Sequence, residues 1–225
     1  MTRSAWITRV LKPALYLAGL APLLWIGAAL GGGLVDGDPV EFIQHVTGRS
    51  ALVALFVTLS VTPARRLTGV SELVRVRRLI GLTAFWYAGL HFASYLVFDQ
   101  MLSPADIAAD VAEHPWVLVG FATFLLLVPL AVTSTAGWVR RLGGRRWQRL
   151  HRLVYVAAAG GVVHYLWLVK QDLRSPLYFA VALSLILGAR LWVARDGQRP
   201  RSRARAAVPA ATSPPSFVAP GEDIL

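Results

Sequence analysis

Three histidines lie within or beside apolar stretches of this 225-residue chain: His91, His151 and His164. An ionisable or metal-binding side chain is costly inside a bilayer, so it usually has a partner and a function. Neutral imidazole is a common ligand of metals and of haem iron. We therefore expect histidines from two different helices to hold haem iron, which favours electron transfer across a membrane.

The composition restricts the kind of protein and the kind of cofactor. The chain is 56% hydrophobic and only 16% charged, which is too apolar for a soluble domain of this length. It has no cysteine, which excludes disulfides, iron–sulfur clusters, thiolate-bound zinc and covalent c-type haem. The net charge of +11 could indicate nucleic acid binding. We expect no nucleic acid partner, however, because the basic residues gather at the ends of apolar segments.

Six apolar segments each approach the roughly 20 residues that a membrane-spanning helix needs. They are residues 13–32, 47–62, 79–98, 116–135, 152–169 and 176–193. This pattern predicts an all-α fold, a polytopic membrane protein in which a six-transmembrane-helix bundle over residues 1–195 holds haem inside the membrane. Residues 196–225 are rich in Arg, Ala, Pro and Ser without apolar periodicity, and we expect a disordered cytoplasmic tail.

The connections between these segments alternate in charge. Lys and Arg gather at the N-terminus, between the second and third segments, between the fourth and fifth, and after the sixth. Acidic residues mark the other side: Asp36, Asp38, Glu41, Asp99, Asp106, Asp110 and Glu113. The positive-inside rule then places both termini in the cytoplasm. The long first segment favours an uncleaved helix over a signal peptide, and Gly31-Gly32-Gly33 follows no strand, so we expect no nicotinamide-binding domain.

Two of the histidines are expected at one depth. His91 lies 12 residues after Leu79, about 18 Å into the membrane, and His164 lies 13 residues after His151, about 20 Å into it. Two imidazoles at one level on parallel helices can hold a porphyrin between them. Iron with two histidine ligands has no open position, which suits electron transfer. The alternative is that both histidines only form hydrogen bonds between helices.

His151 is a weaker candidate ligand. It lies about 20 Å from the level of His164, and on an ideal helix its side chain points about 140° away. A second haem there would need a partner near Arg78, which stays protonated and cannot bind iron. His151 could therefore bind a second haem with an unusual partner, contact a flavin phosphate or a haem propionate, or simply lie at the membrane interface.

Other residues could belong to the haem pocket. Tyr87, His91 and Tyr95 share one helix face, which is either a wall of that pocket or ordinary packing. Three cations near outer segment ends could pair with propionates, and two further histidines flank the acidic connections, where we expect them to be solvated. The cations are Arg49, Lys170 and Arg174, and the histidines are His45 and His114.

Several motifs resemble a known family. The runs 77–82 and 85–91, and the stretch from Gly137 through residues 150–155 to 164–170, are similar to MsrQ, the haem-binding membrane subunit of the bacterial methionine sulfoxide reductase system MsrPQ. The match covers roughly residues 10–195. The chain also resembles, more distantly, the ferric reductase membrane domains. Its third segment lacks the second histidine of that pattern, which argues against a full second bis-histidine site.

The resemblance implies a function in electron transfer for protein repair. MsrQ proteins bind b-type haem and FMN in the bacterial inner membrane, and His91, His151 and His164 match the family's histidine positions. They pass electrons to MsrP, a periplasmic molybdopterin enzyme that reduces methionine sulfoxide in oxidised proteins. We expect this chain to be such a non-catalytic subunit among membrane lipids, with quinol or a separate cytosolic flavin reductase as donor. The alternatives are a b-type cytochrome of another quinol or metal-reduction chain, or a non-redox transporter or assembly protein.

Overall fold

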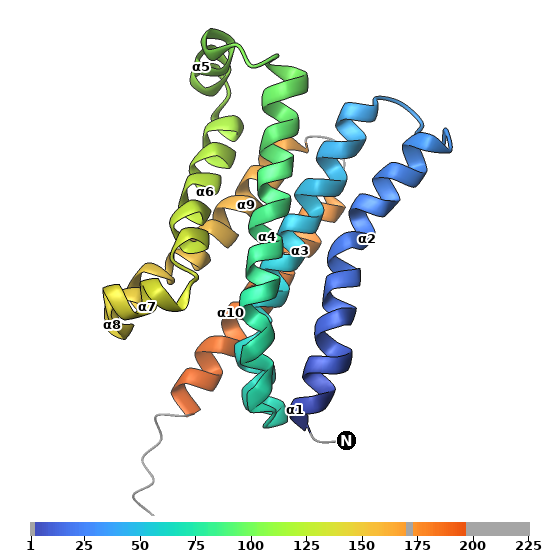
Figure 1. Ribbon diagram of the computed structural model, residues 1–225. Helices are drawn as coiled ribbons and strands as arrows, with labels where there is room; N and C mark the ends of the chain where they lie inside the picture. Colours follow the sequence, from blue (N-terminus) through green and yellow to red (C-terminus); the bar gives the residue numbers. More distant parts are fainter. Residues whose placement is uncertain (1–2, 170–172, 197–225) are drawn as a thin grey trace, which may run out of the picture.

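The computed structural model describes residues 3–169 and 173–196, and this part of the chain is a bundle of helices without strands (Figure 1). Its long helices are α2 (Lys12–Gly31), α3 (Pro39–Thr68), α4 (Val74–Ser94), α6 (Pro115–Val132), α9 (Leu153–Leu168) and α10 (Arg174–Asp196). Short elements join them: α1 (Arg3–Trp6), η1 (Ile7–Leu11), η2 (Ser71–Leu73), η3 (Tyr95–Asp99), α5 (Pro104–Glu113), α7 (Ala136–Leu142) and α8 (Gly144–Leu150). The predicted tail, residues 196–225, lies outside the described residues except for Asp196.

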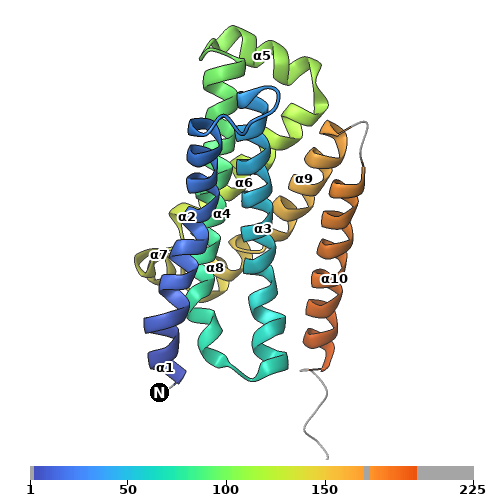
Figure 2. The same cartoon turned by 90° about the vertical axis from the view of Figure 1, so that its right-hand side faces the viewer.

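Each of the six predicted segments forms a helix, so the expected all-α membrane fold is confirmed. Within the described residues, five helices are long and apolar enough to cross a membrane. The exception is α9, whose 16 residues rise about 24 Å, less than the roughly 30 Å of a bilayer core. Figure 2 shows α9 beside α3 and α10 within the bundle.

The predicted boundaries of the second segment, 47–62, were too narrow, because α3 covers Pro39–Thr68. The helix starts at Asp38, whose side chain accepts a hydrogen bond from the Val40 amide at 2.8 Å, and Pro39 occupies its first turn. It ends at Gly69, whose φ of 71° is in the left-handed region that glycine adopts readily. Polar residues in the first two turns interrupt the apolar run and concealed this part of the helix.

The helix α5 was not expected, because its sequence was interpreted as an acidic connection. The Ser103 side chain caps it by accepting a hydrogen bond from the Asp106 amide at 3.4 Å, and Pro104 opens the first turn. Figures 1 and 2 place α5 across one end of the bundle, beyond the ends of α4 and α6. The serine and proline were the sequence signals that could have revealed it.

Small residues on α9 allow it to approach α3 and α6 closely. Ala157 and Ala158 are fully buried in the core cluster. A Cβ atom added to Gly161 would lie 2.9 Å from Cδ2 of Leu52 on α3, and one added to Gly160 would collide with Thr123 on α6. Close approach through small residues is typical of helix packing in membranes. It holds α9, which carries His164, between α3 and α6.

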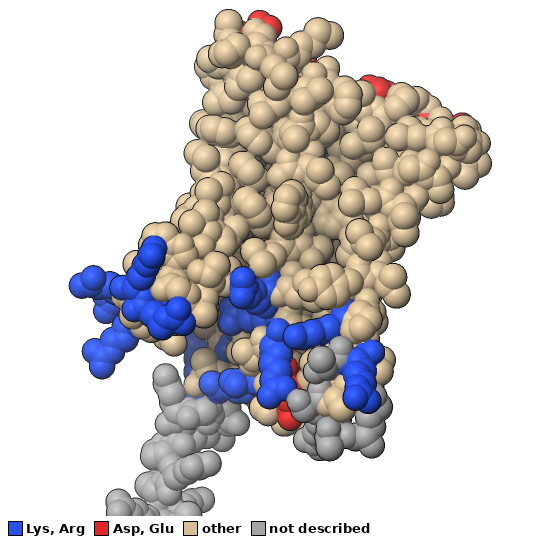
Figure 3. Space-filling view, viewed as in Figure 1, with Lys and Arg blue, Asp and Glu red and all other residues tan. Residues whose placement is uncertain are grey.

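Charge divides the bundle into two ends. Figure 3 shows Lys and Arg gathered at the lower end and acidic residues at the upper edge. We call these the arginine-rich end, where α3 and α10 finish and α4 starts, and the acidic end, where α3 starts and α5 lies. This division agrees with the alternating connections in the sequence and is the structural basis of the expected orientation.

A fusion experiment tests that orientation. We expect green fluorescent protein fused after Leu225 to fluoresce and alkaline phosphatase at the same place to stay inactive, because the positive-inside rule retains the arginine-rich end in the cytoplasm. Phosphatase fused after Gly37, between α2 and α3, serves as the control and should be active. An active C-terminal phosphatase would reverse the orientation.

Candidate functional site

The structure brings the rings of His91 on α4 and His164 on α9 close together. Their ring centroids lie 6.1 Å apart, and the ring planes meet at 74°. The two residues are 73 positions apart in the chain, so the pairing arises from the packing of the helices. These are the two histidines that the sequence placed at one depth.

A backbone carbonyl holds each of these rings by its Nδ1 atom. Nδ1 of His91 lies 3.1 Å from the carbonyl oxygen of Gln44 on α3, and Nδ1 of His164 lies 2.7 Å from that of Trp116 on α6. A carbonyl oxygen can only accept, so each Nδ1 donates its proton and each Nε2 carries the lone pair. Metal-binding histidines are usually held in this way, with the outer nitrogen fixed by a carbonyl or carboxylate.

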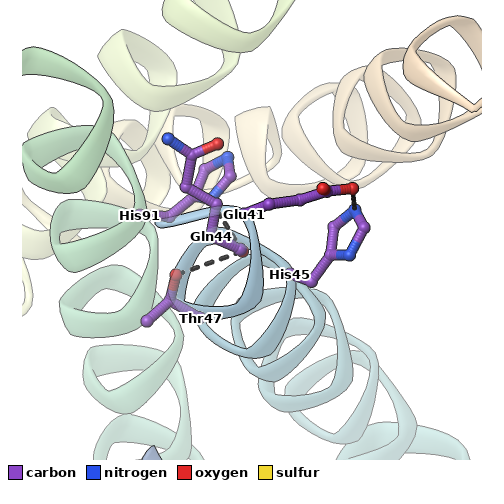
Figure 4. Close-up of polar contacts among 5 residues, drawn as sticks. All are labelled: Glu41, Gln44, His45, Thr47 and His91. Carbon is purple, nitrogen blue, oxygen red and sulfur yellow. Dashed lines mark hydrogen bonds and ion pairs between the residues drawn. The ribbon is translucent and has the colours of Figure 1, made fainter. Parts of the chain in front are cut away.

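Figure 4 shows the surroundings of the Gln44 carbonyl, which lies between His91 and Thr47. The Thr47 hydroxyl also donates to this carbonyl, at 3.2 Å. On the other side of Gln44, its side-chain amide donates to Asp99 at 2.6 Å. Gln44 therefore links α3 to His91 through its carbonyl and to η3 through its side chain.

A glycine one turn beyond each carbonyl makes room for the imidazole. A Cβ atom on Gly48 would lie 3.2 Å from Nδ1 of His91, and one on Gly120 would lie 2.8 Å from Nδ1 and Cε1 of His164. Gly48 follows Gln44 by four residues, and Gly120 follows Trp116 by four. The same arrangement thus occurs twice, once on α3 and once on α6.

A cavity of about 400 Å³ lies around the two histidines and reaches from the acidic end to Leu127 and Ala157 in the core. Its walls are mainly apolar, and Phe92 packs against Phe121 and Phe124 at centroid distances of 5.6 and 4.9 Å. The rim near α5 is polar. Among the residues that line it are Gln44, His45, Arg49, Asp99, Asp110 and His114.

The donor set and the cavity fit a haem. Two Nε2 lone pairs on rings 6.1 Å apart leave room for one iron at about 2 Å from each nitrogen, the usual length for imidazole–metal bonds. The apolar walls suit the macrocycle, and the charged rim suits its two carboxylates. Elsewhere among the described residues, no group of three or more His, Cys, Asp or Glu residues could hold a metal ion.

A chain of contacts closes the acidic end of the cavity. The Tyr95 hydroxyl donates to Asp110 on α5 at 2.6 Å, and Nδ1 of His114 lies 2.7 Å from the same carboxylate. The ring of His114 lies 4.6 Å from that of Trp116, whose carbonyl holds His164. His114 therefore lines the rim of the cavity, and 38% of its side chain stays exposed to solvent. His45 lines the same rim, is half exposed and pairs with Glu41 at 4.0 Å.

His151 is not among the residues that line this cavity. It lies between α8 and α9, with its ring stacked on Trp147 at 3.9 Å and its Nε2 3.0 Å from the Thr133 hydroxyl oxygen. That hydroxyl donates its proton to the Pro129 carbonyl, so Nε2 of His151 is the donor to Thr133. Burial lowers the pKa of His151, and the positive charge of Arg77 lowers it further.

Of the other residues predicted to belong to the haem pocket, some line the cavity and others do not. Tyr95 lines the cavity, but Tyr87 does not, because its hydroxyl donates to the Gly19 carbonyl on α2 and the residue lines a second cavity between α2, α3 and α4. Arg49 lines both cavities and donates to the Ser175 hydroxyl at 3.1 Å. Arg174 does not line the haem-sized cavity, and Lys170 lies outside the described residues.

Comparisons with known proteins agree with this architecture. The family model described as "Ferric reductase like transmembrane component" matches residues 47–162. The chain is 47% identical to the "Protein-methionine-sulfoxide reductase heme-binding subunit MsrQ" of Rhodospirillum rubrum, over 85% of this chain and 94% of that protein. It is 44% identical to the MsrQ of Ralstonia nicotianae, over 89% and 94%. It is 41% identical to that of Xanthomonas oryzae pv. oryzae, over 94% and 99%. No solved structure matches. The chain therefore belongs to the MsrQ family and carries a ferric reductase-like transmembrane component.

Proposed function

We propose that this protein is a b-type haem subunit that passes electrons across the bacterial inner membrane to a periplasmic methionine sulfoxide reductase. The observation that carries the proposal is the facing pair His91 and His164, each with Nδ1 bound to a carbonyl and Nε2 free to bind iron. The relatives' names, which describe a haem-binding subunit of a methionine sulfoxide reductase, support the same function.

The residues around the pair would do three things. His91 and His164 would each bind the iron through Nε2, which would leave no open position for oxygen or another small ligand. The phenylalanines on α4 and α6 exclude water from the cavity, and Arg49 lies where it can balance a carboxylate at the rim. The bound haem would supply one-electron chemistry through its iron.

The partners follow from the orientation. The cavity reaches the acidic end, which we place in the periplasm, so electrons leave there to a molybdopterin reductase of the MsrP type. The donor is quinol or a cytosolic flavin reductase, and FMN is the second cofactor that the resemblance implies. In this scheme the chain is a non-catalytic subunit, and both termini are cytoplasmic. To test this function, the reduced protein is mixed with the oxidised molybdopterin reductase and methionine sulfoxide. Reoxidation of the haem together with reduction of the sulfoxide is expected here, and a cytochrome with another acceptor would show neither.

Loss of either imidazole should remove the haem. We expect His91→Ala and His164→Ala each to lose nearly all of the low-spin haem spectrum, because one remaining ligand cannot complete the six-coordinate site. Absorption spectra of the purified proteins give the result, and C-terminal green fluorescent protein shows that each variant still inserts. If both variants keep a full low-spin spectrum, this pair is not the ligand set.

Gly120 should affect haem binding because it leaves room for the His164 ring. Gly120→Ala places a methyl group 2.8 Å from the His164 ring, so the ring must leave the Trp116 carbonyl. Disturbing the outer hydrogen bond of a ligand costs roughly 10- to 100-fold in metal affinity, and we expect a comparable loss of haem retention and a changed midpoint potential. Gly188→Ala is the control, since no atom lies within 4 Å of its added Cβ. Identical spectra and potentials for the two variants would contradict this account of the site.

His151 should not be needed for the haem between His91 and His164. We expect His151→Ala to keep the spectrum of that haem, because the residue contacts Thr133 and Trp147 and does not line the cavity. The haem-to-protein ratio, measured beside His91→Ala, also counts any second haem that depends on His151. Loss of the same haem in both variants would mean that His151 takes part in this site.

A further inference from the structure

A short connection at the acidic end presents two exposed apolar side chains. Met101 and Leu102 lie between η3 and α5, and their exposed fractions are 83% and 62%. Most other exposed large apolar residues lie on the long helices, where a bilayer would surround them. This connection instead belongs to the end of the bundle that α5 crosses (Figure 2). Apolar side chains exposed at such an end are typical of a surface that meets another molecule.

The backbone holds both residues in a conformation that side chains disfavour. The φ angles of Met101 and Leu102 are 46° and 58°, and these are the two non-glycine residues with positive φ in the described ranges. The left-handed region is costly for a residue with a Cβ atom. Hydrogen bonds fix the turn: the Leu102 amide donates to the Leu96 carbonyl at 2.8 Å, and the Ser103 amide donates to the Gln100 carbonyl at 2.8 Å. Outliers of this kind occur preferentially at functional sites.

Beside this connection, α5 covers the haem-sized cavity. Gln100, just before the pair, and Ile107 and Val111 on α5 line that cavity. Asp106 and Glu113 are seven residues apart, so they share a face of α5, and both are exposed. A helix with its side chains is about 10 Å across. A protein that docks on the exposed side of α5 is therefore separated from the cavity by one layer of helix.

We propose that Met101, Leu102 and the exposed face of α5 form the docking surface for the soluble electron acceptor, a proposal that rests on the function proposed above. The two apolar side chains would enter an apolar depression of the acceptor. Asp106 and Glu113 would meet Lys or Arg residues around that depression. A second copy of this chain does not fit the surface end to end, because its own end is acidic as well.

A bilayer surface is the other class of partner that exposed apolar side chains could meet. Asp99 lies two residues before Met101, and Asp106 lies four residues after Leu102. Anionic lipid headgroups would repel these carboxylates, whereas a basic protein surface would attract them. The charge around the pair therefore favours a protein over a membrane.

The variants change what the connection presents and keep its backbone. Met101→Asn and Leu102→Asn suit the left-handed conformation, which asparagine adopts more readily than most residues, so both should fold. Leu34→Asn is the matched control, because Leu34 is 65% exposed at the same end, between α2 and α3, and does not line the cavity. Asp106→Asn tests the charge, and Asp36→Asn, at another exposed carboxylate of this end, is its control.

The assay follows reoxidation of the haem in the full-length protein, in nanodiscs and after reduction with dithionite. One acceptor is the oxidised periplasmic molybdopterin reductase supplied with methionine sulfoxide. The other is ferricyanide, a small ion that needs no docking surface. We expect Met101→Asn and Leu102→Asn each to raise the reductase concentration for half-maximal rate about 10-fold, as expected for losing an apolar anchor. Their haem spectra and ferricyanide rates should equal those of the wild type and Leu34→Asn.

The acidic residues should act through long-range attraction. Asp106→Asn should make the rate with the reductase less dependent on ionic strength, because salt screens the attraction between opposite charges. Asp36→Asn should keep the salt dependence of the wild type. Leu102→Gly carries the test of the apolar contact if an Asn variant fails to insert, since glycine adopts a positive φ without cost.

A single label distinguishes a protein partner from the bilayer. The chain has no cysteine, so Met101→Cys accepts one bimane group at a defined place. Protection of this label from aqueous iodide when the reductase is added supports the proposal. Quenching of the label by brominated phospholipids in nanodiscs without the reductase would assign the side chain to the bilayer and overturn it.

The kinetic results also tell failure of this surface from failure of the proposed function. If neither Met101→Asn nor Leu102→Asn departs from Leu34→Asn, the docking surface lies elsewhere, and the proposed function stands. If ferricyanide reoxidises the wild-type haem but the reductase does not, the proposed function is wrong, and this surface is rejected with it.

Discussion

The contact between an imidazole and a helix backbone is the constraint on which the rest of the site depends. A Cβ on Gly120 would collide with the His164 ring where it meets the Trp116 carbonyl, and one on Gly48 would crowd the His91 ring at the Gln44 carbonyl. Each carbonyl then fixes the tautomer of its ring. The repetition of this arrangement on α3 and α6 leaves an Nε2 lone pair on each of two rings whose centroids lie 6.1 Å apart.

The packing of α9 follows from the same requirement. His164 can lie opposite His91 only if α9 enters the centre of the bundle, and Ala157, Gly160 and Gly161 leave the space for it to do so. The helices α3, α6 and α10 pack against α9, while the face with Val156, Val163 and Trp167 stays exposed. The cost of glycine in a helix, about 1 kcal/mol relative to alanine, is offset by the close contact of three helices.

The sequence predicted features that depend on one helix at a time. It missed contacts that depend on which helices are neighbours. The number of spans, the charge of their ends and the common level of His91 and His164 all follow from run length and a fixed rise per residue. The glycine–carbonyl contacts require the rotation of each helix and the identity of its neighbours. The helix α5 was missed for another reason, because its acidic residues concealed a short helix that begins with a serine cap and a proline.

The position of the cavity restricts how electrons can reach it. The cavity extends from the acidic end past the middle of the bundle, where Leu127 and Ala157 line it, whereas the half at the arginine-rich end holds packed core residues such as Leu59 that do not line it. A donor that acts at the arginine-rich end therefore needs a second carrier in that half, where His151 is the available ligand. A donor dissolved in the membrane can approach the bundle at the level of the cavity and needs no second carrier. The number of cofactors in the purified protein thus separates a cytosolic donor from a quinol.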